Sequence, residues 1–135
     1  MSHTKSFQIG SLCVNAAMAS ALEQDEVMSL ISAEVINRAY MAARTENASM
    51  GEQILTNMFF SMPSQVKQRV AGVLLSRVFV AGTQQKVTVN DFAGKMVDYN
   101  TLLSQLTLWN FDDFFTYLSD AVKDVVPAHQ NEKAQ

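Results

Sequence analysis

NFDDFFTYLSDAV, residues 110–122, combines phenylalanine and aspartate at the spacing of an α-helix. Its apolar side chains recur at steps of three and four residues, which places them on one helical face. They are Phe111, Phe114, Phe115, Leu118, Val122 and, just beyond the stretch, Val125. Asp113, Tyr117, Asp120 and Asp124 fall on the opposite face. The pattern predicts an amphipathic helix rather than a catalytic site.

Both ends of this helix carry sequence signals. Asn110 is a residue type that caps helix N-termini, so we expect it to cap this one. Asp112 lies in the first turn, where the helix dipole favours negative charge. Pro127 disfavours continuation of the helix. These signals predict a helix over residues 111–126.

Five further helices are predicted upstream. They cover residues 11–22, 25–44, 50–62, 64–81 and 91–106. Asp25 is the expected N-cap of the second, and Pro63 ends the third. The second half of the fourth, RVFVAG, is rich in β-branched residues and is also compatible with an extended strand.

The fold class predicted from these segments is all-α, a compact bundle of about five to six helices. One short extended segment is expected near residues 86–89. Residues 1–126 are expected to form a single domain, since 135 residues suffice for one core of ordinary size. We expect the tail, residues 127–135, to be disordered.

The composition indicates a cytoplasmic protein. No apolar run approaches the roughly 18 residues that a membrane-spanning helix needs, and the N-terminus lacks a signal-peptide pattern. The single cysteine, Cys13, has no partner for an internal disulfide. Because Cys13 is surrounded by small apolar residues, we expect it to be buried.

Residue types that carry catalysis are scarce. The two histidines, His3 and His129, lie near the ends of the chain, where a catalytic triad or a zinc site cannot be held rigidly. The glycines are scattered singly and form no phosphate-binding loop. We therefore expect a protein without enzymatic activity, cofactor or metal.

The predicted helix over residues 50–62 is apolar around most of its circumference. Met50, Ile54 and Phe60 flank its main apolar stripe and are candidate interface residues. A helix of this kind is either central in the fold or shared with a partner. The leading hypothesis is a small interaction or adaptor protein that binds a protein partner of unknown identity and forms a homodimer through this helix.

A DNA-binding regulator is the first alternative. The basic segment, residues 64–90, supplies four candidate contacts to nucleic acid: Lys67, Arg69, Arg77 and Lys86. A simpler interpretation is a solvated basic surface that pairs with the acidic C-terminal part of the chain. Small-molecule binding in an apolar cavity between helices is the second alternative.

Residues 87–106, VTVNDFAGKMVDYNTLLSQL, contain a short pattern that bears on the DNA-binding alternative. They resemble the helix-turn-helix of LacI-type repressors at Val87, Thr88, Asp91, Ala93, Tyr99 and Thr101. The resemblance covers about a seventh of the chain and implies DNA binding. The turn glycine expected after Met96 is absent, and the segment that would read bases has no arginine or lysine. The motif is therefore degenerate.

Overall fold

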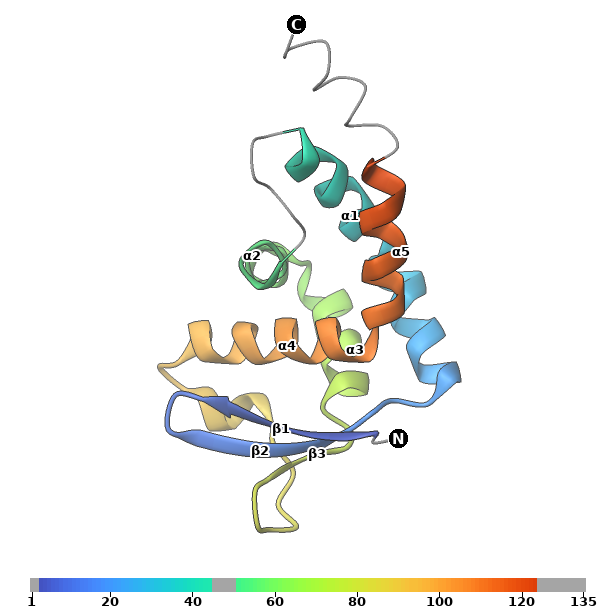
Figure 1. Cartoon of the computed structure of the whole chain (residues 1–135). Helices are drawn as coiled ribbons and strands as arrows, with labels where there is room; N and C mark the ends of the chain where they lie inside the picture. The colour runs from blue at the N-terminus through green and yellow to red at the C-terminus, as the bar shows by residue number, and fades with distance from the viewer. Residues whose placement is uncertain (1–2, 45–50, 124–135) are drawn as a thin grey trace, which may run out of the picture.

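The computed structural model describes residues 3–44 and 51–123, and it combines a small sheet with a layer of helices (Figure 1). The sheet is antiparallel, in the order β1 (Thr4–Ile9), β2 (Leu12–Ala17) and β3 (Val78–Val80). The helices are α1 (Ala21–Ala43), α2 (Glu52–Ser61), α3 (Ser64–Leu74), α4 (Met96–Asn110) and α5 (Asp112–Lys123), with a short 3-10 helix, η1 (Val89–Phe92), before α4. Figure 1 shows α4 lying across the sheet, while α1 and α5 run side by side away from it.

The predicted all-α class is wrong, because the chain opens with a β-hairpin. Residues 11–22, expected to be helical, contain strand β2 instead. Buried Val14 and Ala16 alternate with exposed Cys13 and Asn15, which is the period of two that a strand requires. The expected burial of Cys13 is wrong for the same reason, since its side chain lies on the solvent face of the sheet.

A glycine turn connects the two strands of the hairpin. Gly10 has a φ of 59°, in the left-handed region, at the first position of a two-residue turn. A Cβ atom on Gly10 would lie 2.9 Å from the Asp98 carboxylate oxygen Oδ2. The positive φ therefore favours glycine at this position, and any larger residue would also displace the Asp98 side chain.

Helix α1 begins earlier than the sequence interpretation placed it. Ser20, not Asp25, is its N-cap: the Ser20 hydroxyl accepts the Glu23 backbone N–H at 3.2 Å, and the Glu23 carboxylate accepts the Ser20 backbone N–H at 3.0 Å. This reciprocal capping box satisfies two N–H groups at the helix start. A cap at Asp25 would satisfy only one backbone N–H group through its side chain.

The strand alternative for the segment after α3 is confirmed, and two predicted helices have different bounds in the structure. Helix α3 ends at Leu74, and the β-branched run after it forms β3. The helix predicted over residues 91–106 is replaced by η1 and α4. Lys86 forms an isolated β-bridge with Phe79, so only the first residue of the segment expected at 86–89 pairs as a strand.

The two-faced interpretation of residues 110–122 is confirmed for α5. Phe111 and Leu118 are buried, Phe114 and Phe115 are partly buried, and Tyr117 is 67% exposed. The expected cap is wrong: Asn110 is the last residue of α4. The predicted tail, residues 127–135, lies outside the described residues.

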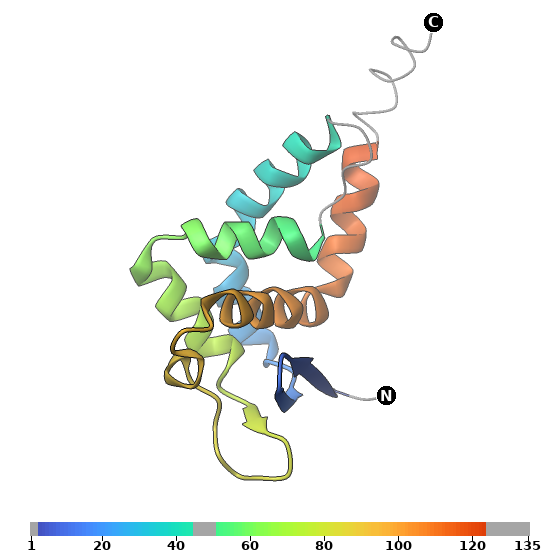
Figure 2. The same ribbon diagram turned by 90° about the vertical axis from the view of Figure 1, so that its left-hand side faces the viewer.

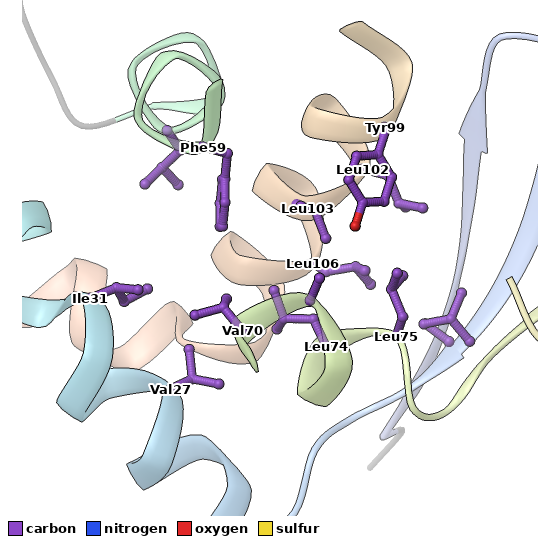
Figure 3. Packing of buried hydrophobic residues seen from close by; sticks show 14 of the residues in the cluster. Val27, Ile31, Phe59, Val70, Leu74, Leu75, Tyr99, Leu102, Leu103 and Leu106 are labelled. Carbon is purple, nitrogen blue, oxygen red and sulfur yellow. The ribbon is translucent and has the colours of Figure 1, made fainter. Parts of the chain in front are cut away.

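The hydrophobic core lies between α4, the other helices and the inner face of the sheet (Figure 3). In Figure 3, Leu106 of α4 lies close to Leu74 of α3, and Ile31 of α1 and Val70 of α3 belong to the same buried cluster. Phe59 of α2 is completely buried in the same cluster. Helix α4 therefore connects the sheet to the rest of the helical layer.

An ion pair between α1 and the segment before β3 makes stability depend on pH. The backbone N–H of Ser20 and the Arg77 guanidinium lower the pKa of Glu23 from 4.5 to about 2. Since the pKa is depressed in the folded state, the stabilisation is present above pH 4.5 and is lost as the pH falls toward 2. We expect Glu23→Gln to lower Tm at pH 7. The difference in Tm between the variant and the wild type should become smaller as the pH falls from 4.5 toward 2. Thermal unfolding followed at several pH values measures both effects, and a Tm difference that stays constant over this pH range would contradict them.

Candidate interaction surface

Ile54 and Phe60, the two described residues of the predicted α2 interface, do not lie in one patch. Ile54 lines a shallow pocket with Arg38 and Met41 of α1, whereas Phe60 lies beside Lys67 of α3. The two side chains thus flank the buried stripe of α2 on different sides. Met50 lies outside the described residues. Phe60 is 48% exposed, so α2 is not covered on all sides. The homodimer stays a prediction.

Two of the four basic candidates are engaged in ion pairs with α1. Arg69 contacts Glu26 at 3.1 Å, and Arg77 contacts Glu23 at 2.5 Å. The expected pairing with the acidic C-terminal part is therefore wrong for these two arginines. Lys86 is exposed in the loop after β3. Acidic side chains of α1 thus neutralise two of the four candidate contacts to nucleic acid.

The degenerate helix-turn-helix at residues 87–106 does not form two helices. Its first part is the single 3-10 turn of η1, and its second part belongs to the continuous helix α4. Tyr99, one of the matching positions, is 6% exposed in the core. The segment therefore presents no recognition helix of the repressor type. DNA binding stays a prediction without support from this geometry.

Lys67 lies at one end of a polar network that connects three helices. Its ammonium donates to Asn100 Oδ1 at 2.5 Å and lies 5.5 Å and 5.9 Å from the ring centroids of Tyr99 and Phe60. Burial lowers the pKa of Lys67 and raises that of Tyr99, because both charged forms lose hydration. One helical turn after Asn100 in α4, the hydroxyls of Ser104 and Thr56 are hydrogen-bonded at 2.9 Å. These contacts join α2, α3 and α4, which gives Lys67 a structural role.

A groove of about 720 Å³ lies beside β1. Residues 5–8 of β1 form one wall, and Leu108 and Trp109 of α4 belong to the other. Glu52 of α2 and Asp112 of α5 add carboxylates to the lining. We call it the β1 groove. Sequence reasoning missed it, because its two walls are about a hundred residues apart in the chain.

An aromatic pair lies in the β1 groove. The rings of Phe7 and Trp109 meet edge to face, with centroids 5.8 Å apart and planes inclined by 70°. The Lys5 ammonium lies 5.4 Å from the centroid of the Phe7 ring. Trp109, the single tryptophan of the chain, is only partly buried. Phe7 is only 7% exposed, so Trp109 supplies most of the accessible aromatic surface. Charged groups surround it, a composition that protein-binding sites use.

The wall formed by β1 carries main-chain groups that face outward. Ile9 and Leu12 flank the two-residue turn at 10–11, so this pair exchanges main-chain hydrogen bonds between β1 and β2. In an antiparallel ladder, bonded pairs alternate with non-bonded ones. Ser6 and Gln8 therefore occupy non-bonded positions, and their N–H and C=O groups point away from β2.

A bond on the other side of β2 agrees with this assignment. Cys13, the partner of Gln8 in the register, accepts a hydrogen bond from the Ala81 N–H at 2.9 Å. Its carbonyl thus points toward β3 and away from β1. β1 is also the terminal strand of the sheet, and no described element pairs with its outer edge (Figure 2). The edge of β1 is open to pairing over Ser6 and Gln8.

Comparisons with known proteins add no family. No protein-family model matches the chain, and no curated protein or solved structure is significantly similar to it. Within residues 3–44 and 51–123, no three residues of the types His, Cys, Asp and Glu gather as a metal site would require. None of the helices in those ranges combines the length and apolar character needed to cross a bilayer.

Proposed function

We propose that the protein is a small, non-catalytic interaction protein that binds a segment of another polypeptide in the β1 groove. The observation that supports this proposal is the coincidence of an open strand edge with the Phe7–Trp109 pair in one hollow. Aromatic side chains at the centre of an interface supply much of the binding energy, and main-chain groups supply direction. A cytoplasmic location is part of the proposal, since the single cysteine provides no internal disulfide.

The shape of the groove favours a polypeptide over a small molecule. Sites for small molecules enclose most of the ligand surface and are lined mainly by apolar side chains. The β1 groove is instead open along a strand, and Lys5, Glu52, Gln105 and Asp112 are among its lining residues. The small-molecule alternative expected a cavity between helices, whereas this hollow has a strand as one wall.

Peptide selection tests the proposal even though the partner is unidentified. A phage-displayed library of random 12-residue peptides is selected on the wild-type protein, and enriched peptides are then synthesised. We expect saturable binding that changes the fluorescence of Trp109, because this is the only tryptophan of the chain and it lies in the groove. Failure to enrich any saturable binder would contradict the proposal.

Two variants localise the binding. We expect Trp109→Ala to weaken binding of a selected peptide by more than about tenfold in calorimetric titrations, as at an aromatic hot spot. Tyr117→Ala is the matched control, since Tyr117 is 67% exposed on α5 and does not line the groove. Circular dichroism verifies that both variants are folded. Equal affinities for wild type and Trp109→Ala would place the binding elsewhere.

A further inference from the structure

We infer that the bound segment adds to the sheet as a fourth strand along the outer edge of β1, an inference that rests on the proposed function. The N–H and C=O groups of Ser6 and Gln8 are at non-bonded positions of the β1–β2 ladder and point toward the space that such a strand would occupy. An extended chain is the ligand whose own alternating donors and acceptors match this row. Strand spacing of about 4.8 Å places it directly beside β1.

The inner face of the sheet decides which side chains the added strand presents to the groove. Phe7 and Ile9 point from β1 toward the helices, and Trp109 lies against Phe7. Alternate side chains of an added strand point to this same face. One large apolar side chain of the partner therefore packs beside Phe7 and Trp109, while its neighbours in sequence face solvent.

Charge further restricts the partner. The groove contains the carboxylates of Glu52 and Asp112 and the ammonium of Lys5. Gln105 Nε2 donates to Glu52 Oε1 at 3.0 Å, which fixes one of these carboxylates at the groove wall. The net negative charge favours a cationic segment. The ligand class is thus an extended peptide with a large apolar residue and a basic residue on the same face.

Proline at position 6 tests strand addition against a matched control. Ser6→Pro removes the outward N–H, and Ser6→Ala keeps it, while both lose the hydrogen bond from the Ser6 hydroxyl to Asn15 Oδ1. Proline is tolerated on an edge strand where the N–H faces solvent. We expect Ser6→Pro to weaken binding of a selected peptide by about tenfold or more, and Ser6→Ala by about twofold or less. Equal affinities of the two variants would overturn strand addition.

Methylation of the peptide gives a second reading that does not depend on folding of a variant. Each backbone nitrogen of the selected peptide is methylated in turn. Strand addition predicts that binding is lost at every second position only, where the N–H faces β1. A scan without this period of two, together with sensitivity to Trp109→Ala, would overturn strand addition and leave the proposed function intact. Loss of the Trp109 dependence as well would overturn both.

A second copy of the chain is the competing occupant of the edge. Light scattering of the wild type and of Ser6→Pro separates this case from the inferred one. We expect the same mass for both proteins. A wild-type dimer that Ser6→Pro converts into a folded monomer would show that β1 pairs with β1 of another copy, and would overturn the inference of a foreign segment.

Discussion

Phe59→Ala is expected to lower the free energy of unfolding by about 3–5 kcal/mol, because it removes a large aromatic side chain from a well-packed core. Phe59 is fully buried, and in Figure 3 it points from α2 toward the side chains of α3 and α4. A domain of this size has a total stability of about 5–15 kcal/mol. The expected loss is thus a substantial fraction of the total stability. Urea unfolding followed by circular dichroism measures the loss.

The next residue in the chain is the matched control. Phe60 is the same residue type in the same helix, but it is 48% exposed and contacts the Lys67 ammonium. We expect Phe60→Ala to cost about 1 kcal/mol or less, the range of an exposed cation–π contact and a surface substitution. Similar losses at both positions would mean that the buried stripe of α2 is assigned wrongly. A loss of stability for Phe60→Ala well above about 1 kcal/mol would favour the interpretation in which α2 is covered on all sides.

The hairpin was predictable from the sequence, although the alanine content of residues 11–22 concealed it. In residues 7–16, FQIGSLCVNA, apolar side chains recur at every second position on both sides of a Gly-Ser pair. Two alternating runs separated by two turn residues are a hairpin signal. Alanine has a high helix propensity, but burial of Val14 and Ala16 against the helices outweighs this weak preference.

The long, strongly periodic helices were predictable, and their ends were less so. The period of α1 and α5 identifies the faces that the structure buries. The start of α1 was misplaced because Asp25 and Ser20 are both good caps, and only the capping box with Glu23 distinguishes them. The limit between α3 and β3 depends on pairing with β2, a contact that a local pattern does not encode.

The β1 groove is beyond local sequence reasoning. Phe7 belongs to a strand near the start of the chain, and Trp109 belongs to a helix near its end. Their contact depends on α4 lying across the sheet, which no spacing within either segment specifies. The same holds for Arg77 and Arg69, whose acidic partners lie on α1 rather than in the acidic C-terminal part. What the sequence does provide is a tryptophan whose position becomes informative once the fold is known.

Asn110→Asp distinguishes the sequence interpretation of one residue from its place in the structure. As the N-cap of the last helix, Asn110 would tolerate aspartate, since the two residues cap helices about equally well. In the structure, Asn110 is 7% exposed and bridges two segments. Its Oδ1 accepts the Ala19 N–H at 2.9 Å, and its Nδ2 donates to the Leu106 carbonyl at 2.9 Å.

Aspartate can make only the first of these two bonds when it is ionised. Its second oxygen would face the Leu106 carbonyl, so an acceptor would meet an acceptor in a buried site. We expect a loss of about 1–3 kcal/mol in the free energy of unfolding at pH 7, the cost of a broken buried hydrogen bond. The difference from wild type should shrink as the pH falls and the carboxyl gains a proton, because a protonated carboxyl can donate to Leu106.

The same substitution at an exposed helical position provides the control for Asn110→Asp. Asn57 of α2 is exposed, and Asn57→Asp is expected to change stability by no more than about 0.5 kcal/mol. Urea unfolding of both variants at pH 7 and at lower pH, each compared with wild type, isolates the effect of the buried bond. If Asn110→Asp left stability unchanged, the buried hydrogen bonds of Asn110 would not stabilise the fold, as the capping interpretation implies. The contact between the end of α4 and the segment between β2 and α1 would then contribute nothing measurable.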